Sequence, residues 1–131
     1  MKMNLHHIRS IVTEFERAPN EVNSIIETSQ YGVCLTDFNG IYTSVNQKYL
    51  DIYKYKREEL LGKHFTIVVP EAAVTLMKDI YEEFLISKAS TSRMWTVITK
   101  DKKSLTVNLE ALYTEAFTLP HRVIFIEPIE F

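Results

Sequence analysis

The chain has 131 residues, of which 46% are hydrophobic and 24% charged, and its formal net charge is −2. This length predicts one domain with its own core, and the charge argues against the basic surface of a nucleic-acid-binding protein. No stretch reaches the roughly 20 apolar residues of a membrane span. The single Cys34 has no partner for a disulfide within the chain, so we expect a reducing, cytoplasmic environment.

Two helical segments are expected before residue 30. Six apolar residues share a helical stripe with heptad-like spacing, interrupted at Pro19: Leu5, Ile8, Val12, Phe15, Val22 and Ile26. Asn20 is placed to cap the second segment. Two roles are open for the stripe, which covers the domain's own sheet or forms a seam between the subunits of a homodimer, alone or alongside that covering role. We therefore divide the chain into a helical cap and dimerisation segment, residues 1–29, and the main domain, residues 30–131.

A tight hairpin is expected between two short strands, residues 31–36 and 41–45. In the four residues between them, Asp37 and Asn39 can accept hydrogen bonds from nearby backbone, and Gly40 tolerates a positive φ. Asn46 then follows at the start of a helix, where its side-chain oxygen can accept from the backbone N–H of Tyr49. The sequence thus predicts two paired strands with a helix starting directly after the second.

The rest of the chain predicts helices first and strands afterwards. A short helical turn ends at Gly62, and Pro70 is placed as the first residue of a longer helix that runs to Ser87. Three strands follow at residues 93–99, 105–113 and 123–126, and the last is apolar at every position, so we expect cover on both faces. The fold class is therefore α+β, with a five-stranded antiparallel sheet, helices inserted after the second strand and an amphipathic N-terminal helix.

This order resembles the PAS family of sensory domains. The resemblance rests on "YGVCLTDFNGIYTSVNQKYLDIYKYKREELLGK" at residues 31–63, and on a Trp95-x-Val97 strand followed by "KDKKS" and a long alternating strand. It covers about residues 22–128, and the glycine often found in the second hairpin is absent. A PAS domain implies a non-catalytic sensory and dimerisation module, with a signalling partner or a fused effector such as a histidine kinase or a cyclase. Whether the chain is a stand-alone regulator or a fragment of a larger sensor stays open.

The interior of a PAS fold can hold a small ligand. By inward phase and by the resemblance, the candidate interior residues are Tyr49, Tyr53, His64, Phe65, Met77, Ile80, Trp95, Thr96 and Phe125. His64 and Thr96 are the polar candidates in this set. The alternative is a dry core in which these side chains only pack, as in a protein-interaction scaffold without a ligand.

Cofactor chemistry is disfavoured by the residues present. Haem-binding PAS domains carry an axial histidine on the connecting helix, and residues 70–88 contain none; Met77 there fits core packing better. Light-sensing flavin relatives need a cysteine in the turn before that helix, whereas Cys34 lies in the first strand, where burial raises a thiol's pKa. Asn108 lies at a position where flavin-binding relatives present an amide, so a non-covalent flavin stays open as a lesser alternative.

Metal and catalytic sites lack support in the sequence. His6 and His7 are adjacent on a helix and diverge by roughly 100°, and His64 and His121 have no ligand at suitable spacing. No phosphate loop or nucleophile elbow occurs. We expect no bound metal and no enzymatic activity from this chain.

Overall fold

The computed structural model describes residues 3–129, so the outermost residues of both predicted segments lie outside it. Five strands form one antiparallel sheet in the order β2-β1-β5-β4-β3. The elements in chain order are α1 (Leu5–Arg17), η1 (Pro19–Glu21), α2 (Val22–Glu27), β1 (Gly32–Asp37), β2 (Tyr42–Val45), α3 (Gln47–Tyr53), α4 (Arg57–Leu60), η2 (Phe65–Val68), η3 (Glu71–Ala73), α5 (Val74–Ser87), β3 (Thr91–Ile98), β4 (Ser104–Phe117) and β5 (Leu119–Pro128). The predicted α+β fold, with helices inserted after the second strand, is confirmed.

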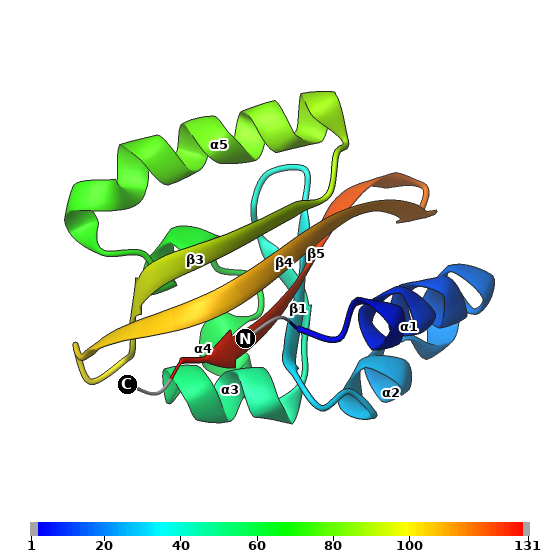
Figure 1. Cartoon of the computed structure of the whole chain (residues 1–131), viewed down its shortest axis with the longest axis horizontal. Helices are drawn as coiled ribbons and strands as arrows, with labels where there is room; N and C mark the ends of the chain where they lie inside the picture. Colours follow the sequence, from blue (N-terminus) through cyan, green and yellow to red (C-terminus); the bar gives the residue numbers. More distant parts are fainter. Residues whose placement is uncertain (1–2, 130–131) are drawn as a thin grey trace.

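The sheet separates two apolar cores. One core lies between the sheet and α1 with α2, and the other lies between the sheet and the group α3 to α5 (Figure 1). β5 is the central strand, and its side chains alternate between the two cores: Val123 and Phe125 face α1, whereas Ile124 and Ile126 face the inserted helices. The prediction that this strand is covered on both faces is confirmed.

The hairpin and the helix that follows it form as the sequence predicts. Asp37 Oδ1 accepts from the backbone N–H of Asn39 at 2.9 Å and of Ile41 at 3.1 Å, and Gly40 adopts φ +80°. Asn46 Oδ1 accepts from the Tyr49 backbone N–H at 3.0 Å and caps α3. These short-range hydrogen bonds need no tertiary contact, which explains why the residue types alone located them.

Several boundaries differ from the predictions, and β5 for instance begins at Leu119 instead of residue 123. Asn20 caps no helix, because it lies inside η1; the side-chain cap in this region is Asn4, which accepts from the His7 backbone N–H at 3.0 Å. Pro70 precedes η3 as its cap, so the helical turn begins one residue later. β4 continues to Phe117, four residues beyond the predicted end, because its second half pairs with β5.

The N-terminal stripe covers the chain's own sheet. Ile8, Val12, Phe15, Val22 and Ile26 are buried in the core shared with β1 and β5. Leu5 alone of the six stays accessible, with 44% of its surface exposed. The covering role is therefore the observed one. The intersubunit seam stays a prediction, and a partner would meet a stripe whose five residues are already buried within the chain.

Candidate ligand cavity

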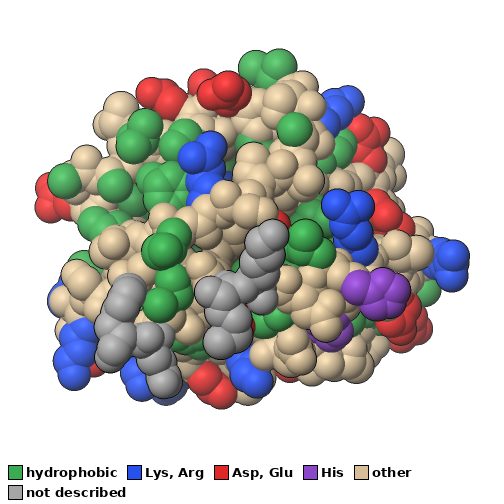
Figure 2. All heavy atoms as spheres, in the orientation of Figure 1, with side chains coloured by type: hydrophobic (Ala, Val, Ile, Leu, Met, Phe, Trp, Pro, Cys, Tyr) green, Lys and Arg blue, Asp and Glu red, His purple; other side chains and the backbone are tan. Residues whose placement is uncertain are grey.

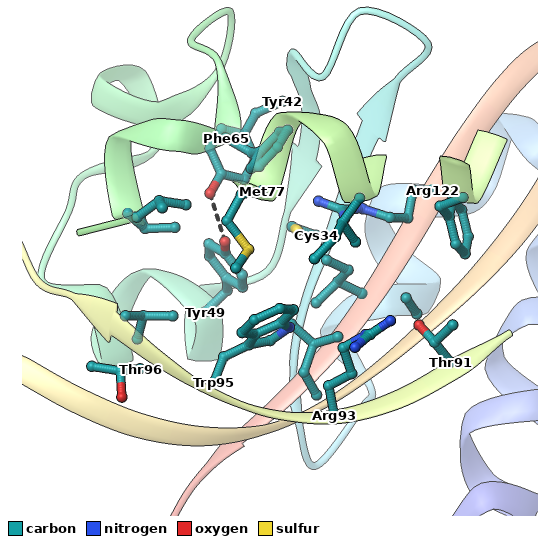
Figure 3. A pocket seen from close by; sticks show the side chains of 18 of the residues that line it. Cys34, Tyr42, Tyr49, Phe65, Met77, Thr91, Arg93, Trp95, Thr96 and Arg122 are labelled. Carbon is teal, nitrogen blue, oxygen red and sulfur yellow. Dashed lines mark hydrogen bonds between the residues drawn. The ribbon is translucent and has the colours of Figure 1, made fainter. Parts of the chain in front are cut away.

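A cavity of about 160 Å³ lies between the inner face of the sheet and α5. The roof consists of Met77, Ile80 and Phe84 from α5, and Trp95 closes it from β3 (Figure 3). On the face of the molecule over α5 and β3, hydrophobic side chains gather, with charged side chains around them (Figure 2). The cavity is thus mostly apolar and lies beneath one helix.

Seven of the nine predicted interior residues line this cavity: Tyr49, Tyr53, Phe65, Met77, Ile80, Trp95 and Thr96. Thr96 lies on the edge strand β3 with an exposed side chain, so it contributes only at the rim. These residues come from α3, η2, α5 and β3, which meet around the cavity.

Phe125 and His64 do not line the cavity. Phe125 belongs to the core on the other face of the sheet, with α1. The sequence pattern gave no way to choose its face, because β5 is apolar on both sides. The ring of His64 packs on Phe65 with centroids 4.6 Å apart, and its Nδ1 lies 3.0 Å from the Thr66 hydroxyl. Both residues serve local packing, so their place among the interior candidates is corrected.

One end of the cavity is a tyrosine cluster. The Tyr42 and Tyr49 hydroxyls lie 2.6 Å apart, and the rings of Tyr49 and Tyr53 have centroids 4.6 Å apart. Burial raises the pKa of all three hydroxyls, so they stay neutral. Hydroxyls that satisfy one another can still offer a lone pair or a proton to a ligand.

The other end contains Arg122, which sequence analysis missed. Figure 3 shows its side chain reaching from β5 toward Cys34. The guanidinium carbon lies 4.3 Å from the ring centroid of Tyr81 and 4.9 Å from that of Phe65. The sequence did contain a signal for this position. Arg122 comes directly before the apolar run 123–126, and because side chains alternate along a strand it lies on the same face as Ile124.

Arg122 has little polar compensation. Its Nε is buried without a hydrogen-bond partner, and among residues 3–129 it forms no ion pair. Tyr81 directs its hydroxyl elsewhere, to the carbonyl of Asp37 and the hydroxyl of Thr36. Burial lowers the pKa of the guanidinium, and an arginine nevertheless remains charged in proteins. Arg122 is therefore the cation of the inner wall, whereas Arg93, the other arginine of the lining, is exposed at the rim.

The groups that line the cavity suit the binding of a ligand. Burial raises the pKa of the Cys34 thiol to about 12, as the sequence predicted in direction, so this group is a poor nucleophile. Within the described residues, no cluster of three His, Cys, Asp or Glu side chains could hold a metal ion. Asn108, the residue considered for a flavin, lies beside Met3 and Leu5 on the outer face of the sheet. It cannot reach a ligand in this cavity.

The comparison with known families decides the identity of the fold. The model of the PAS fold matches residues 20–118. The chain belongs to the PAS family. Among the residues that the structure describes, no helix of this PAS domain is long and apolar enough to cross a membrane.

Solved PAS domains show the same fold at low sequence identity. A PAS domain from Desulfitobacterium hafniense superposes with a TM-score of 0.72 at 16% identity, covering 79% of this chain and 97% of that one. A domain of a sensory box sensor histidine kinase/response regulator from Geobacter sulfurreducens has a TM-score of 0.68 at 20% identity, covering 82% and 92%. The PAS-B domain of Drosophila melanogaster Cycle with bound ethylene glycol has a TM-score of 0.64 at 9% identity, covering 75% and 99%.

Proposed function

We propose that this PAS domain is a cytoplasmic sensory module that binds a small organic molecule in the cavity beneath α5. The observation that carries the proposal is the cavity itself: about 160 Å³, apolar walls, a tyrosine cluster at one end and an arginine at the other. Binding sites for small molecules combine apolar walls with a few placed polar groups in this way. Any catalytic output belongs to another domain or partner.

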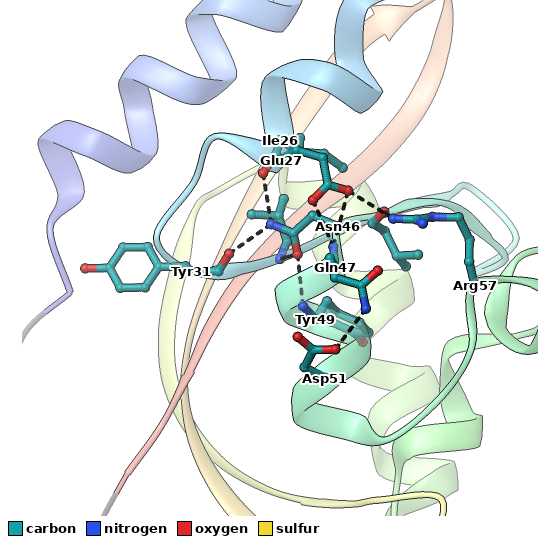
Figure 4. A network of polar contacts seen from close by, with 10 residues as sticks. Ile26, Glu27, Tyr31, Asn46, Gln47, Tyr49, Asp51 and Arg57 are labelled. Carbon is teal, nitrogen blue, oxygen red and sulfur yellow. Dashed lines mark hydrogen bonds and ion pairs between the residues drawn. The ribbon is translucent and has the colours of Figure 1, made fainter.

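The signal would pass from the cavity to the N-terminal helices through Asn46. Its side-chain amide donates to the carbonyls of Ile26 at 2.9 Å and Tyr31 at 3.0 Å, and its oxygen accepts from Val33 and Tyr49 (Figure 4). Tyr49 also lines the cavity, so a ligand that shifts α3 acts on the end of α2 through one buried side chain. Such a shift changes the balance between two packings of the N-terminal helices.

The binding step is tested by native mass spectrometry of freshly purified protein and by one cavity-filling variant. Met77 points into the cavity, whereas its neighbour Leu76 is 56% exposed and lines no part of it. We expect a small molecule to copurify with the wild-type protein and with Leu76→Trp, and to be lost from Met77→Trp. Wild-type protein that carries no molecule and binds none from a metabolite extract would contradict the proposal.

A protein-interaction scaffold without a ligand is the second candidate. The observation that favours it is the tyrosine cluster, in which three large side chains already fill one end of the interior and satisfy the Tyr42 and Tyr49 hydroxyls. A scaffold predicts that Met77→Trp leaves partner binding unchanged, whereas the sensory proposal predicts that it locks one signalling state. A pull-down with the cognate effector separates the two.

A homodimer remains part of the sensory proposal, with a different contact surface. Leu5 is 44% exposed and Met94 is 61% exposed, and both line one shallow groove on the outer face of β3 and β4. A second copy of the chain would cover this groove together with the outer sheet. We expect Leu5→Glu with Met94→Glu to give a monomer by light scattering; an unchanged dimer would remove the groove from that role.

Domains of sensor histidine kinases are among the similar structures, which supports a kinase as effector.

A further inference from the structure

We infer that the ligand is a small carboxylate with a single-ring or similarly sized apolar body, held by Arg122. The inference rests on the proposed ligand-binding function and names the chemical class of that ligand. It follows from a largely covered cation for which the described residues supply no ion-pair partner, in a cavity whose other ionic lining residues, Glu83 and Arg93, are exposed at the opening.

The charge of the ligand follows from the surroundings of Arg122. Its ring neighbours are Phe65 and Tyr81, and the titratable lining residues Cys34, Tyr42 and Tyr49 are neutral because burial raises the pKa of each. A buried charge without a partner is costly, and in other proteins such a charge is paired with an anion. An anion in the cavity would supply the missing charge partner of the guanidinium and accept hydrogen bonds from its terminal N–H groups.

The number of charges on the ligand is one. Two other ionic side chains line the opening, Glu83 on α5 and Arg93 on β3, and both are exposed to solvent, with Arg93 lying over the Trp95 ring at 5.5 Å. They oppose each other in sign and are screened by water. One guanidinium on the inner wall therefore remains, and its planar fork matches a carboxylate in two parallel hydrogen bonds. A phosphate monoester would bring more negative charge than this site compensates.

The size and shape of the ligand follow from the cavity. Its volume of about 160 Å³ is close to that of cavities of about 150 Å³ that hold one benzene ring. Phe65, Trp95 and Met77 line the cavity with apolar side chains that suit such a body, and the Met77 thioether is flexible. The carboxylate would point to Arg122 and the ring toward the tyrosine cluster.

The experiment compares carboxylates with their neutral amides. Benzoate and phenylacetate are titrated against benzamide and phenylacetamide by calorimetry and by the emission of Trp95, the single tryptophan of the chain, which lines the cavity. We expect each carboxylate to bind at least about tenfold more tightly than its amide. Amides that bind as tightly as the carboxylates, at millimolar concentration or below, would overturn the inference.

Variants assign the effect to one residue. Arg122→Met should weaken benzoate binding by about thirtyfold or more and leave benzamide unchanged, because a buried charge pair is lost. Arg122→Lys keeps the charge without the planar guanidinium, so its affinity for benzoate should lie between those of the wild-type protein and Arg122→Met. Arg93→Gln, at the exposed rim, should change benzoate binding by less than about threefold. Equal benzoate affinity in the wild-type, Arg122→Lys and Arg122→Met proteins would overturn the assignment.

The two proposals fail in different ways. If amides bind and Met77→Trp blocks them, the cavity is a ligand site and only the carboxylate inference is wrong. If no titrated compound changes Trp95 emission and no molecule copurifies, the sensory proposal itself fails. Where Arg122→Met does not fold, the carboxylate-to-amide ratio in the wild-type protein and in Arg122→Lys decides the inference alone.

Discussion

Asn46 is a buried side chain whose amide pairs with backbone groups from three parts of the chain. It joins the end of α2 and the segment before β1 to the start of β1 and of α3. A second link runs beside it, where Glu27 accepts from the backbone N–H of Gln47 and from Arg57 at 2.9 Å, both exposed. The exposed pair contributes little to stability, so the junction depends chiefly on Asn46.

Asn46→Ala is therefore predicted to lower the free energy of unfolding by about 3 kcal/mol. The change removes the partner of the Tyr31 carbonyl and of the Val33 and Tyr49 backbone N–H groups and one hydrogen bond to the Ile26 carbonyl, which also accepts from the Ser29 N–H. Urea denaturation measures the loss. Asn23→Ala, at an exposed position of α2, is the control and should stay within about 0.5 kcal/mol of the wild-type protein. Equal small losses in both variants would show that Asn46 does not hold the junction.

His64 gives a second prediction at this scale, on pH. Burial lowers its pKa below the ordinary value of 6.5, with smaller contributions from Lys78 and Arg122. The unfolded chain therefore binds a proton at a higher pH than the folded one, so stability present at neutral pH is lost as the pH falls through about 6.5. We expect the melting temperature of His64→Gln to fall less than that of the wild-type protein between about pH 7 and pH 5.5. His6→Gln, on the exposed face of α1, should retain the wild-type profile.

At the scale of elements, α1 behaves as a wall of the core. Ile8 and Phe15 have no exposed surface, and the Phe15 ring lies 6.0 Å from that of Phe117 at the end of β4. Thr114 on the same strand donates to Glu16 at 2.8 Å. These contacts tie α1 to the sheet over its whole length, so its apolar stripe cannot be separated from the fold.

Ile8→Glu is predicted to unfold most of the protein under native conditions. The change removes a fully buried side chain and places a carboxylate without a partner in the core, at a cost of more than about 4 kcal/mol, close to the whole stability of a small domain. Circular dichroism and thermal denaturation measure the effect. Arg9→Glu, one residue further on the exposed face, should leave the melting curve nearly unchanged. A folded monomer from Ile8→Glu would instead support the intersubunit seam.

The elements differ in how well the sequence predicted them. The hairpin at Asp37 and the cap at Asn46 depend on hydrogen bonds between near neighbours, so residue type located them. The end of β4 depends on its partner strand β5 across a bend, with the register shift between Thr114 and Phe117, and no local signal contains that information. Local chemistry is visible in sequence, and long-range pairing is not.

The residues of the cavity also differ in how well the sequence predicted them. Met77, Ile80 and Trp95 were predicted because period and phase place them inward. Phe125 was assigned to the wrong face because alternation gives no direction on a strand that is apolar throughout. Arg122 was missed because a charged residue is expected at the surface, whereas its guanidinium packs against the rings of Phe65 and Tyr81.

On the scale of the whole molecule, the two cores are coupled. β5 contributes side chains to both, and Asn46 connects α2 to α3 on the other side. The cavity lies in one core, and the N-terminal helices close the other (Figure 1). A change in the packing of the first core therefore has two physical routes to the second, one through the central strand and one through a buried amide.

Met77→Trp tests this coupling without any ligand. Filling the cavity should stabilise α5 against the sheet by about 1 kcal/mol, which slows hydrogen exchange there roughly fivefold. Because Tyr49 lines the cavity and α3 is capped by Asn46, we expect slower hydrogen exchange in α2 as well. In the control Leu76→Trp, hydrogen exchange in α5 and α2 should match that of the wild-type protein.

The route is identified by combining the two variants. In a Met77→Trp, Asn46→Ala protein, slower exchange should persist in α5 and disappear from α2 if the amide carries the coupling. Persistence in α2 would assign the coupling to β5, whose side chains reach both cores. If Met77→Trp alone leaves α2 unaffected, the cavity and the N-terminal helices are energetically independent, and the mechanism of signal transmission proposed for this domain is wrong.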